Sequence, residues 1–367
     1  MKHTSSYLEW YVKTPELRHD FRSSGIGRFH FNLNLGEVDL STNFWHGNPE
    51  VLKSLARLYG VALENVFVSS EGTSGQNARI VRVLAEKSGA KNEAVVEYPT
   101  YDPLLRQVQE HFCSVKRLER KEEDSYRLDV DALRKVVTRK TGLVVLTNPH
   151  APSGAICTSK DLREIMTVAH ERGFYVLCDE IYAEFDRSAV PTLFSVDKER
   201  GIVTSSFTKA YGLGGIKLGV ALAEKQLVDE LYTDVLNTVG NSSNIVQIIA
   251  SEILTKGKEK LEAHKQKWIR LKKVTEEWLN EKSIDYFPSK VALTYWIEMP
   301  VRDTYKWVNE KAVPRFSLAL VPGAFFLFKS DYKIVESKMA RLGLGNFNPQ
   351  TADLADGLQT LEKAMRA

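Results

Sequence analysis

The sequence is poor in cysteine, in long apolar runs and in charge of one sign. It has three cysteines in 367 residues (Cys113, Cys157 and Cys178), and their spacing fits neither a disulfide framework nor a zinc site. No run of about 18 apolar residues is present, so no membrane span is predicted. The net charge of +3 combines 50 basic with 47 acidic residues, which argues against a nucleic-acid-binding face.

Two further absences narrow the class of protein. The N-terminal residues lack the apolar segment of a signal peptide, so we expect a cytoplasmic protein that binds neither membranes nor nucleic acid. The eight histidines show no paired spacing of the kind that binds metals, and no metal is predicted.

The sequence does contain a repeated alternation of short apolar runs and amphipathic segments. Five such runs begin near residues 64, 93, 142, 173 and 201. This alternation predicts an α/β fold, with a mostly parallel sheet flanked by helices on both faces. A long helical stretch follows from Ile245 to about Lys282, and the remainder is typical of a smaller α+β domain. We predict a large domain over 45–260 and a small domain formed by 1–44 and 261–367.

Polar and aromatic side chains follow each apolar run at its C-terminal end. They are Gly72 and Thr73 at the start of a helix, Tyr101, Asn148, Asp179 with Tyr182, and Lys209. Ligands of open parallel sheets bind beyond the carboxyl ends of the strands. We therefore expect these groups to share one site.

This set of groups suits pyridoxal 5′-phosphate (PLP). The aldehyde of PLP needs a lysine amine with which to form an imine, and Lys209 is the candidate. The protonated pyridine nitrogen needs a buried carboxylate, for which Asp179 is placed. Tyr182 and Asn148 are candidate donors to the ring 3-oxygen, and Tyr101 is a candidate platform for the flat ring.

The segment SSFTKAYGLGGIKLG, residues 205–219, contains two lysines with different predicted roles. Lys209 would hold the aldehyde end of the cofactor, and Lys217 would reach the phosphate. Ser206 would add a hydroxyl to the phosphate site, beside the helix N-terminus at Gly72 and Thr73. The glycines between the lysines allow the backbone to turn tightly.

Taken in order, these segments resemble the class I/II aminotransferases, which are fold-type I PLP enzymes. The resemblance covers roughly residues 35–345 and rests on five motifs: GTS at 72–74, PTY at 99–101, NPHAPSG at 148–154, DEIYAEF at 179–185 and the lysine segment. The late segment ARLGLG, 340–345, resembles the one whose arginine, here Arg341, grips the substrate carboxylate. Asn148 is a second candidate for that contact. The resemblance also implies a homodimer with sites at the subunit interface.

Three positions depart from the family pattern. Lys217 stands where the family usually has arginine, so the phosphate loses a bidentate partner. Glu71 precedes the phosphate turn, where a small residue is more usual, and we expect its side chain to point away. Phe44 and Trp45 lie where many relatives send a tyrosine to the phosphate of the partner subunit, and neither has a hydroxyl.

We predict a PLP-dependent aminotransferase that moves an amino group between an amino acid and a 2-oxo acid by a ping-pong mechanism. In this scheme Lys209 forms the aldimine and then acts as general base. A lyase such as a β-C–S lyase would share every cofactor residue and stays open as an alternative. An inactive binding homologue fits less well, because Lys209, Asp179 and Tyr182 are all present.

Two functions of other classes fit poorly. A nucleotide hydrolase would need G-x-x-x-x-G-K-[ST], which is absent. In a dinucleotide-binding fingerprint, the third glycine would fall on Lys217. The amino donor is not readable from the sequence, although Arg22, Arg28 or Arg315 are candidate partners for an acidic or phosphorylated side chain.

Overall fold

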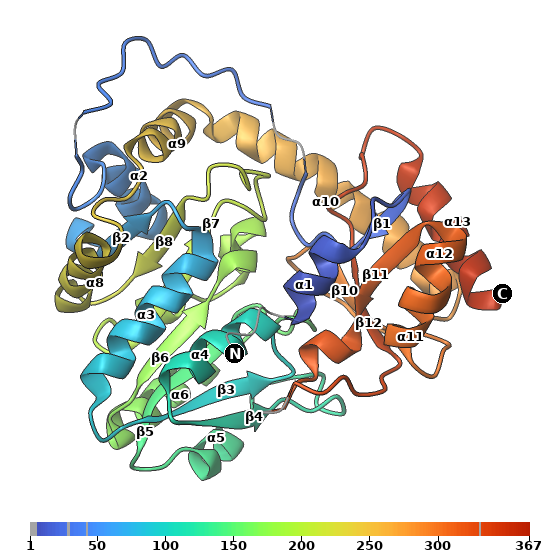
Figure 1. Ribbon diagram of the computed structural model, residues 1–367, viewed down its shortest axis with the longest axis horizontal. Coiled ribbons are helices and arrows are strands. Elements are labelled where there is room, and N and C mark those ends of the chain that lie inside the picture. Colours follow the sequence, from blue (N-terminus) through green and yellow to red (C-terminus); the bar gives the residue numbers. More distant parts are fainter. Residues whose placement is uncertain (1–5, 28–29, 42, 330–331) are drawn as a thin grey trace.

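The computed structural model describes residues 6–27, 30–41, 43–329 and 332–367, which form two sheets (Figure 1). The larger sheet has the strand order β2-β8-β7-β6-β5-β3-β4. Neighbouring strands from β7 to β4 are parallel, whereas β8 runs antiparallel to both of its neighbours. The strands are β2 (Val66–Ser69), β3 (Glu93–Tyr98), β4 (Ser114–Glu119), β5 (Thr141–Thr147), β6 (Tyr175–Asp179), β7 (Gly201–Ser206) and β8 (Gly219–Leu222).

Helices cover both faces of this sheet, which confirms the predicted α/β class. Alternate residues of β5 point to opposite faces, so Leu143 and Val145 join one apolar core and Val144 and Leu146 the other. The first core includes residues of α3 (Gly72–Ser88), α4 (Asp102–His111) and α8 (Lys225–Thr238). The second includes residues of α2 (Pro49–Tyr59), α5 (Val130–Val136), α6 (Ser159–Arg172) and α9 (Asn244–Lys256). Burial on both sides explains the nearly continuous apolar runs in the sequence.

The ends of α6 illustrate how local sequence fixes these elements. The Thr158 hydroxyl accepts a hydrogen bond from the Asp161 N–H at 3.1 Å, and the Asp161 carboxylate accepts one from the Thr158 N–H at 2.7 Å. This capping box starts the helix. Gly173 ends it in the left-handed region, with φ of 73°. The short turn that follows leads into β6, which delivers Asp179 to the site.

The smaller sheet has the order β1-β11-β12-β10-β9. Its strands are β1 (His19–Phe21), β9 (Tyr286–Phe287), β10 (Thr294–Glu298), β11 (Leu318–Pro322) and β12 (Met339–Gly343). Because β1 pairs in parallel with β11, the N-terminal segment shares a sheet with strands from the last third of the chain. The exact domain limits near residues 44 and 260 stay a prediction.

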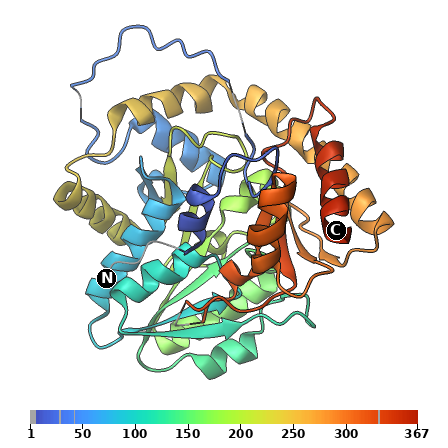
Figure 2. The same cartoon turned by 45° about the vertical axis from the view of Figure 1, so that its right-hand side comes forward.

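The long helix α10 (Lys258–Glu281) runs from the edge of the larger sheet to the smaller one, as Figures 1 and 2 both show. The helix α1 (Ser6–Lys13) lies between α4 and the smaller sheet. The remaining helices are α7 (Leu193–Val196), α11 (Thr304–Trp307), α12 (Val313–Phe316) and α13 (Asp353–Arg366). Across the described ranges, no helix combines the length and the apolar character needed to cross a membrane.

Candidate active site

A cavity of about 650 Å³ lies at the carboxyl ends of the parallel strands and takes its walls from both sheets. The structure brings eight of the ten predicted site residues to its walls. They are Gly72, Thr73, Tyr101, Asp179, Tyr182, Lys209, Lys217 and Arg341. The other two, Asn148 and Ser206, are not among the residues that line it. The cavity therefore contains most of the predicted site.

Asp179 ends β6 as a buried carboxylate held by neutral donors. Its Oδ2 accepts a hydrogen bond from Asn77 Nδ2 at 2.8 Å, and its Oδ1 accepts one from the Ile181 N–H at 3.1 Å. Asn77 is itself oriented by the Thr204 hydroxyl, which donates to its Oδ1 at 2.6 Å. Burial raises the pKa of Asp179 to about 6. A protonated pyridine nitrogen would supply the positive charge that this buried carboxylate favours.

Lys209 follows β7, and its backbone packs closely against the N-terminal segment. The Lys209 carbonyl accepts a hydrogen bond from the Ile26 N–H at 2.7 Å. A Cβ atom on Gly25 would lie 2.9 Å from Lys209 Cδ and 3.0 Å from Lys209 Cα, so only glycine leaves room here. Burial lowers the pKa of the Lys209 amine; Tyr7 and Asp179 oppose this effect, whereas the charges of Arg341 and Lys217 add to it. The net lowering of the pKa makes the neutral, nucleophilic amine easier to form.

The N-terminus of α3 forms one end of the cavity and is suited to a phosphate. Gly72 adopts φ of 66°, and its N–H donates to the Lys217 carbonyl at 2.6 Å. Lys217 itself adopts a left-handed φ of 48°, and its side chain is exposed at the cavity wall. The Thr73 hydroxyl is buried and has no hydrogen-bond partner among the described residues. A phosphate at this helix N-terminus would satisfy that hydroxyl.

Asn148 is one of the two predicted site residues that do not line the cavity. Both ends of the Asn148 amide are used within the protein, since Nδ2 donates to the Pro191 carbonyl and Oδ1 accepts from the Cys157 N–H, each at 3.0 Å. From the same loop it is Ala151, without a polar side chain, that lines the cavity. The predicted contacts of Asn148 with the cofactor and the substrate stay a prediction.

Ser206 is the second predicted site residue that does not line the cavity. Its hydroxyl is fully buried and lies 2.7 Å from that of Thr208, which does line the cavity. The predicted contact of Ser206 with the phosphate stays a prediction, and Thr208 is a further hydroxyl residue at the cavity.

Arg341 lines the cavity from β12 of the smaller sheet. It is 3% exposed, and its Nη2 donates to the Tyr7 hydroxyl and to the Arg22 carbonyl, each at 3.0 Å. Its Nε is buried without a partner in the described part of the chain. A carboxylate beside this guanidinium would satisfy the free nitrogen, as predicted for a substrate clamp.

Tyr7 is a cavity residue that the sequence reasoning missed. Its N–H donates to Asp102 Oδ2 at 3.0 Å, and its ring centroid lies 5.7 Å from that of Tyr101. The spacing of Tyr7, Trp10 and Tyr11 is that of one helix face. That spacing predicts burial, but only the tertiary structure shows that Tyr7 reaches Arg341.

The three other arginines considered for substrate binding have different positions. Arg22 lines the cavity, but its guanidinium is paired with Asp20 through Nε–Oδ1 at 2.8 Å and Nη2–Oδ2 at 2.9 Å. Arg315 is exposed on α12 and does not line the cavity. Arg28 lies outside the described residues. Among these, Arg22 alone has a place at the described site.

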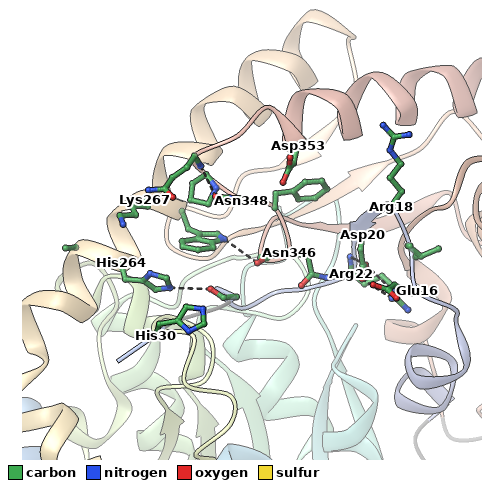
Figure 3. A pocket seen from close by; sticks show the side chains of 18 of the residues that line it. Glu16, Arg18, Asp20, Arg22, His30, His264, Lys267, Asn346, Asn348 and Asp353 are labelled. Atoms are coloured by element: carbon green, nitrogen blue, oxygen red, sulfur yellow. Dashed lines mark hydrogen bonds and ion pairs between the residues drawn. The ribbon is translucent and has the colours of Figure 1, made fainter. Parts of the chain in front are cut away.

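A second cavity of about 920 Å³ adjoins the first and shares Arg22 and Gly27 with it (Figure 3). Some of its polar groups have partners within the protein. His264 Nε2, labelled in Figure 3, lies 3.3 Å from the Gly27 carbonyl oxygen, and the Trp268 indole N–H donates to the Gly345 carbonyl at 3.3 Å. Among the described residues, none of its side chains has a buried polar atom without a partner. The cavity around Lys209 is therefore the better candidate for a cofactor site.

The family model described as "Aminotransferase class I and II" matches residues 36–341. The chain belongs to this family. A histidinol-phosphate aminotransferase of Methanococcus aeolicus is 24% identical over 245 residues, which is 66% of this chain and 64% of that protein. Aromatic-amino-acid aminotransferase 2 of Thermococcus litoralis is 28% identical over 214 residues, which is 56% of this chain and 54% of that protein. The match thus spans less than two thirds of the length of these relatives.

The fold is also that of solved aminotransferases. A PLP-dependent aminotransferase of Streptococcus suis superposes with a TM-score of 0.83 at 22% identity, over 100% of this chain and 98% of that one. An aspartate aminotransferase of Thermus thermophilus superposes with a TM-score of 0.76 at 19% identity, over 87% of this chain and 82% of that one. The predicted fold-type I architecture is confirmed. PLP is the cofactor of the family. The unpaired Thr73 hydroxyl, the buried Asp179 carboxylate and the lowered pKa of Lys209 are consistent with PLP binding in this cavity.

Proposed function

We propose that this protein is a PLP-dependent aminotransferase that acts on an amino acid and a 2-oxo acid. The observation that carries the proposal is a single cavity lined by Lys209, Asp179 and Arg341. They are an amine with a lowered pKa, a buried carboxylate and an arginine whose Nε has no partner among the described residues, which supports the proposed chemistry. The family and the names of the relatives support the same reaction class.

The residues of this chain would divide the work as follows. PLP, when bound, supplies a conjugated ring that takes up the negative charge left at the substrate Cα. Lys209, whose pKa is lowered by burial, would bind the aldehyde carbon and then take the Cα proton with its freed amine. Asp179 would keep a proton at the pyridine nitrogen. Thr73, with Lys217, would hold the phosphate.

The substrate end would be formed by Arg341 and Tyr7. Arg341 has a buried free Nε for a carboxylate oxygen. The Tyr7 hydroxyl accepts from Arg341 Nη2 and so keeps its own proton available for the same carboxylate. One clamp of this kind serves donor and acceptor acids alike, as a ping-pong mechanism requires. The homodimer and the cytoplasmic location rest on the resemblance and on the sequence, and they stay predictions.

The decisive experiment is a half-reaction without any oxo acid. Mixing the PLP-loaded enzyme with single amino acids should convert the visible absorbance of the Lys209-bound cofactor to that of pyridoxamine phosphate for a subset of them. Adding 2-oxoglutarate or pyruvate should restore the first band. The Lys209→Ala variant is the control and should show no conversion. If no amino acid bleaches the band, while cysteine-like substrates release pyruvate and ammonia catalytically, the protein is a lyase and the proposal is wrong.

A further inference from the structure

An acidic residue stands at the start of the helix that would bind the phosphate. Glu71 is the N-cap residue of α3, and its carboxylate makes no capping hydrogen bond to the N–H groups of the first turn. A carboxylate at an N-cap usually accepts from the N–H groups of the second or third helical residue. Here those groups belong to Thr73 and Ser74, which line the cavity together with Glu71 itself. The side chain of Glu71 must therefore be held elsewhere.

Because Gly75 has no side chain, it leaves room for the side chain of Glu71 along the helix surface. Residues 71, 75 and 79 are spaced by four and lie on one face of the helix. A Cβ atom on Gly75 would overlap Glu71 Cβ and lie 3.3 Å from its Cγ and 3.2 Å from its Oε2. Glycine in a helix interior costs about 0.5–1 kcal/mol relative to alanine. Its presence in the first turn is explained if Glu71 has to lie along the helix rather than over its end.

Arg79 is the residue that receives Glu71. Its Nη2 donates to Glu71 Oε1 at 2.9 Å and to Oε2 at 2.8 Å, so both carboxylate oxygens are engaged. Arg79 is 5% exposed, and its Nη1 donates to Asp234 and, at 3.1 Å, to the Thr238 hydroxyl on α8. These contacts with α8 hold the Arg79 guanidinium in place independently of Glu71.

Arg82 completes the charge balance of this cluster. Its Nη2 donates to Asp234 Oδ1 at 2.7 Å, and it makes no ion pair with Glu71 in the described structure. The two arginines thus offset the two carboxylates. Without Arg79, Asp234 would still have a cation in Arg82, whereas Glu71 would lose both of its guanidinium hydrogen bonds.

We propose that Arg79 is a positioning residue that holds Glu71 away from the N-terminus of α3 and so keeps this turn open to the PLP phosphate. If Arg79 is lost, the Glu71 carboxylate keeps the 3.3 Å hydrogen bond from the Ser69 hydroxyl but loses its ion pair, and it can turn back to the N–H groups of Thr73 and Ser74. It would then compete with the phosphate for the same donors and repel its charge. This inference rests on the proposed PLP function and goes beyond it, because neither Arg79 nor Glu71 touches the reacting atoms.

The test is a set of PLP titrations of the cofactor-free full chain, followed by the visible absorbance of the Lys209-bound cofactor. Arg79→Gln should raise the dissociation constant of PLP by about tenfold or more. The double variant Glu71→Gln/Arg79→Gln should return to within about threefold of the parent, since the unpaired charge is gone. Arg82→Gln removes a neighbouring arginine that does not contact Glu71, and it should stay within about threefold of the parent.

Pyridoxal, which lacks the phosphate, separates the phosphate end from the ring site. Its affinity should be unchanged in Arg79→Gln if only the phosphate turn is affected. The inference is overturned if Arg79→Gln binds PLP as tightly as the parent, if the double variant stays as weak as Arg79→Gln, or if pyridoxal binding falls equally. A parent protein in which borohydride fixes no PLP on Lys209 would instead remove the proposed function, and this inference with it.

A second variant guards against misfolding of Arg79→Gln. Gly75→Ala leaves Arg79 intact, introduces a good helix former and displaces Glu71 by steric overlap. It should raise the PLP dissociation constant by at least about fivefold. Glu71→Gln in the Gly75→Ala background keeps the overlap and removes only the charge. Recovery of PLP affinity in that double variant supports the inference, and failure to recover contradicts it.

Discussion

Asp179→Asn is predicted to stabilise the cofactor-free protein while it disables the enzyme. Asp179 is 7% exposed, and burial raises the pKa of its carboxyl from 3.8 to about 6. A carboxyl with a raised pKa destabilises the folded state once the pH is high enough to ionise it, because the charge is solvated better in the unfolded chain. The site therefore holds a charge that the fold alone would not favour.

The sign and size of the effect follow from these pKa values. Below about pH 4 the carboxyl is protonated in both states and has little effect on stability. As the pH rises from about 4 to about 6, the folded state is progressively destabilised, and the loss is constant above that range. Each tenfold change in the ionisation constant corresponds to about 1.4 kcal/mol, so ionised Asp179 lowers the free energy of unfolding near neutral pH by about 3 kcal/mol.

Asparagine can replace the carboxylate without leaving a donor unpaired. Its Oδ1 can still accept from the Ile181 N–H. The Asn77 amide can rotate so that its oxygen accepts from the new amide, and the Thr204 hydroxyl can then donate elsewhere and accept from Asn77. We therefore expect most of the destabilisation to be relieved, a gain of about 2–3 kcal/mol near neutral pH.

Urea unfolding of the cofactor-free protein, followed by tryptophan fluorescence, measures this gain. The midpoint of Asp179→Asn should exceed that of the parent at about pH 7.5, and the gap should nearly close at about pH 4. Asp124→Asn, at an exposed position, is the matched control and should change neither midpoint. The PLP-loaded Asp179→Asn should lose turnover by at least about a hundredfold. A variant no more stable than the parent at neutral pH would refute the reasoning about burial, and one with near-normal turnover would refute the role of Asp179.

Three further predictions concern single residues of the cavity. Borohydride treatment of the PLP-loaded protein should fix the cofactor on Lys209, and peptide mapping of the adduct to any other lysine would contradict the assignment. Lys217→Ala should release PLP on dialysis much faster than the parent does, while the turnover of the loaded fraction changes little; equal retention would show that Lys217 does not contact the phosphate. Tyr7→Phe keeps the ring and removes the hydroxyl beside Arg341, so KM for the amino acid should rise by about tenfold at unchanged PLP affinity. An unchanged KM would limit Tyr7 to a packing role.

The sequence predicted those parts of the site that depend on strand periodicity. Parallel strands buried on both faces have a strong apolar signature, and their ends are readable, so Asp179 and Lys209 could be placed at one edge. Residues that reach the cavity from other elements could not be placed. Gly25 and Tyr7 come from the N-terminal segment, and their approach to the site depends on the way β1 and α1 dock.

Loop side chains were the other weak point. The Asn-Pro loop is recognisable in the sequence. Its asparagine side chain could bond either to a ligand in the cavity or to nearby backbone groups, and hydrophobic periodicity does not distinguish these two orientations. In the structure Asn148 is held by Pro191 and Cys157. The orientation of the Glu71 side chain could not be determined from the sequence for the same reason. Its predicted orientation away from the phosphate is supported by the pairing with Arg79, which lies two helical turns away.

The charges around the cavity show why Glu71 and Arg22 have to be neutralised. Lys217 and Arg341 provide two cationic groups, and Asp179 is a carboxylate at the same cavity, whose lining also includes Glu71 and Arg22. This excess of positive charge matches a bound phosphate and a substrate carboxylate. Glu71 would cancel part of it at the phosphate end, and Arg22 would add to it at the substrate end. Both line the cavity, but each is paired with a residue of opposite charge, Arg79 and Asp20, which offsets its charge toward the two anions.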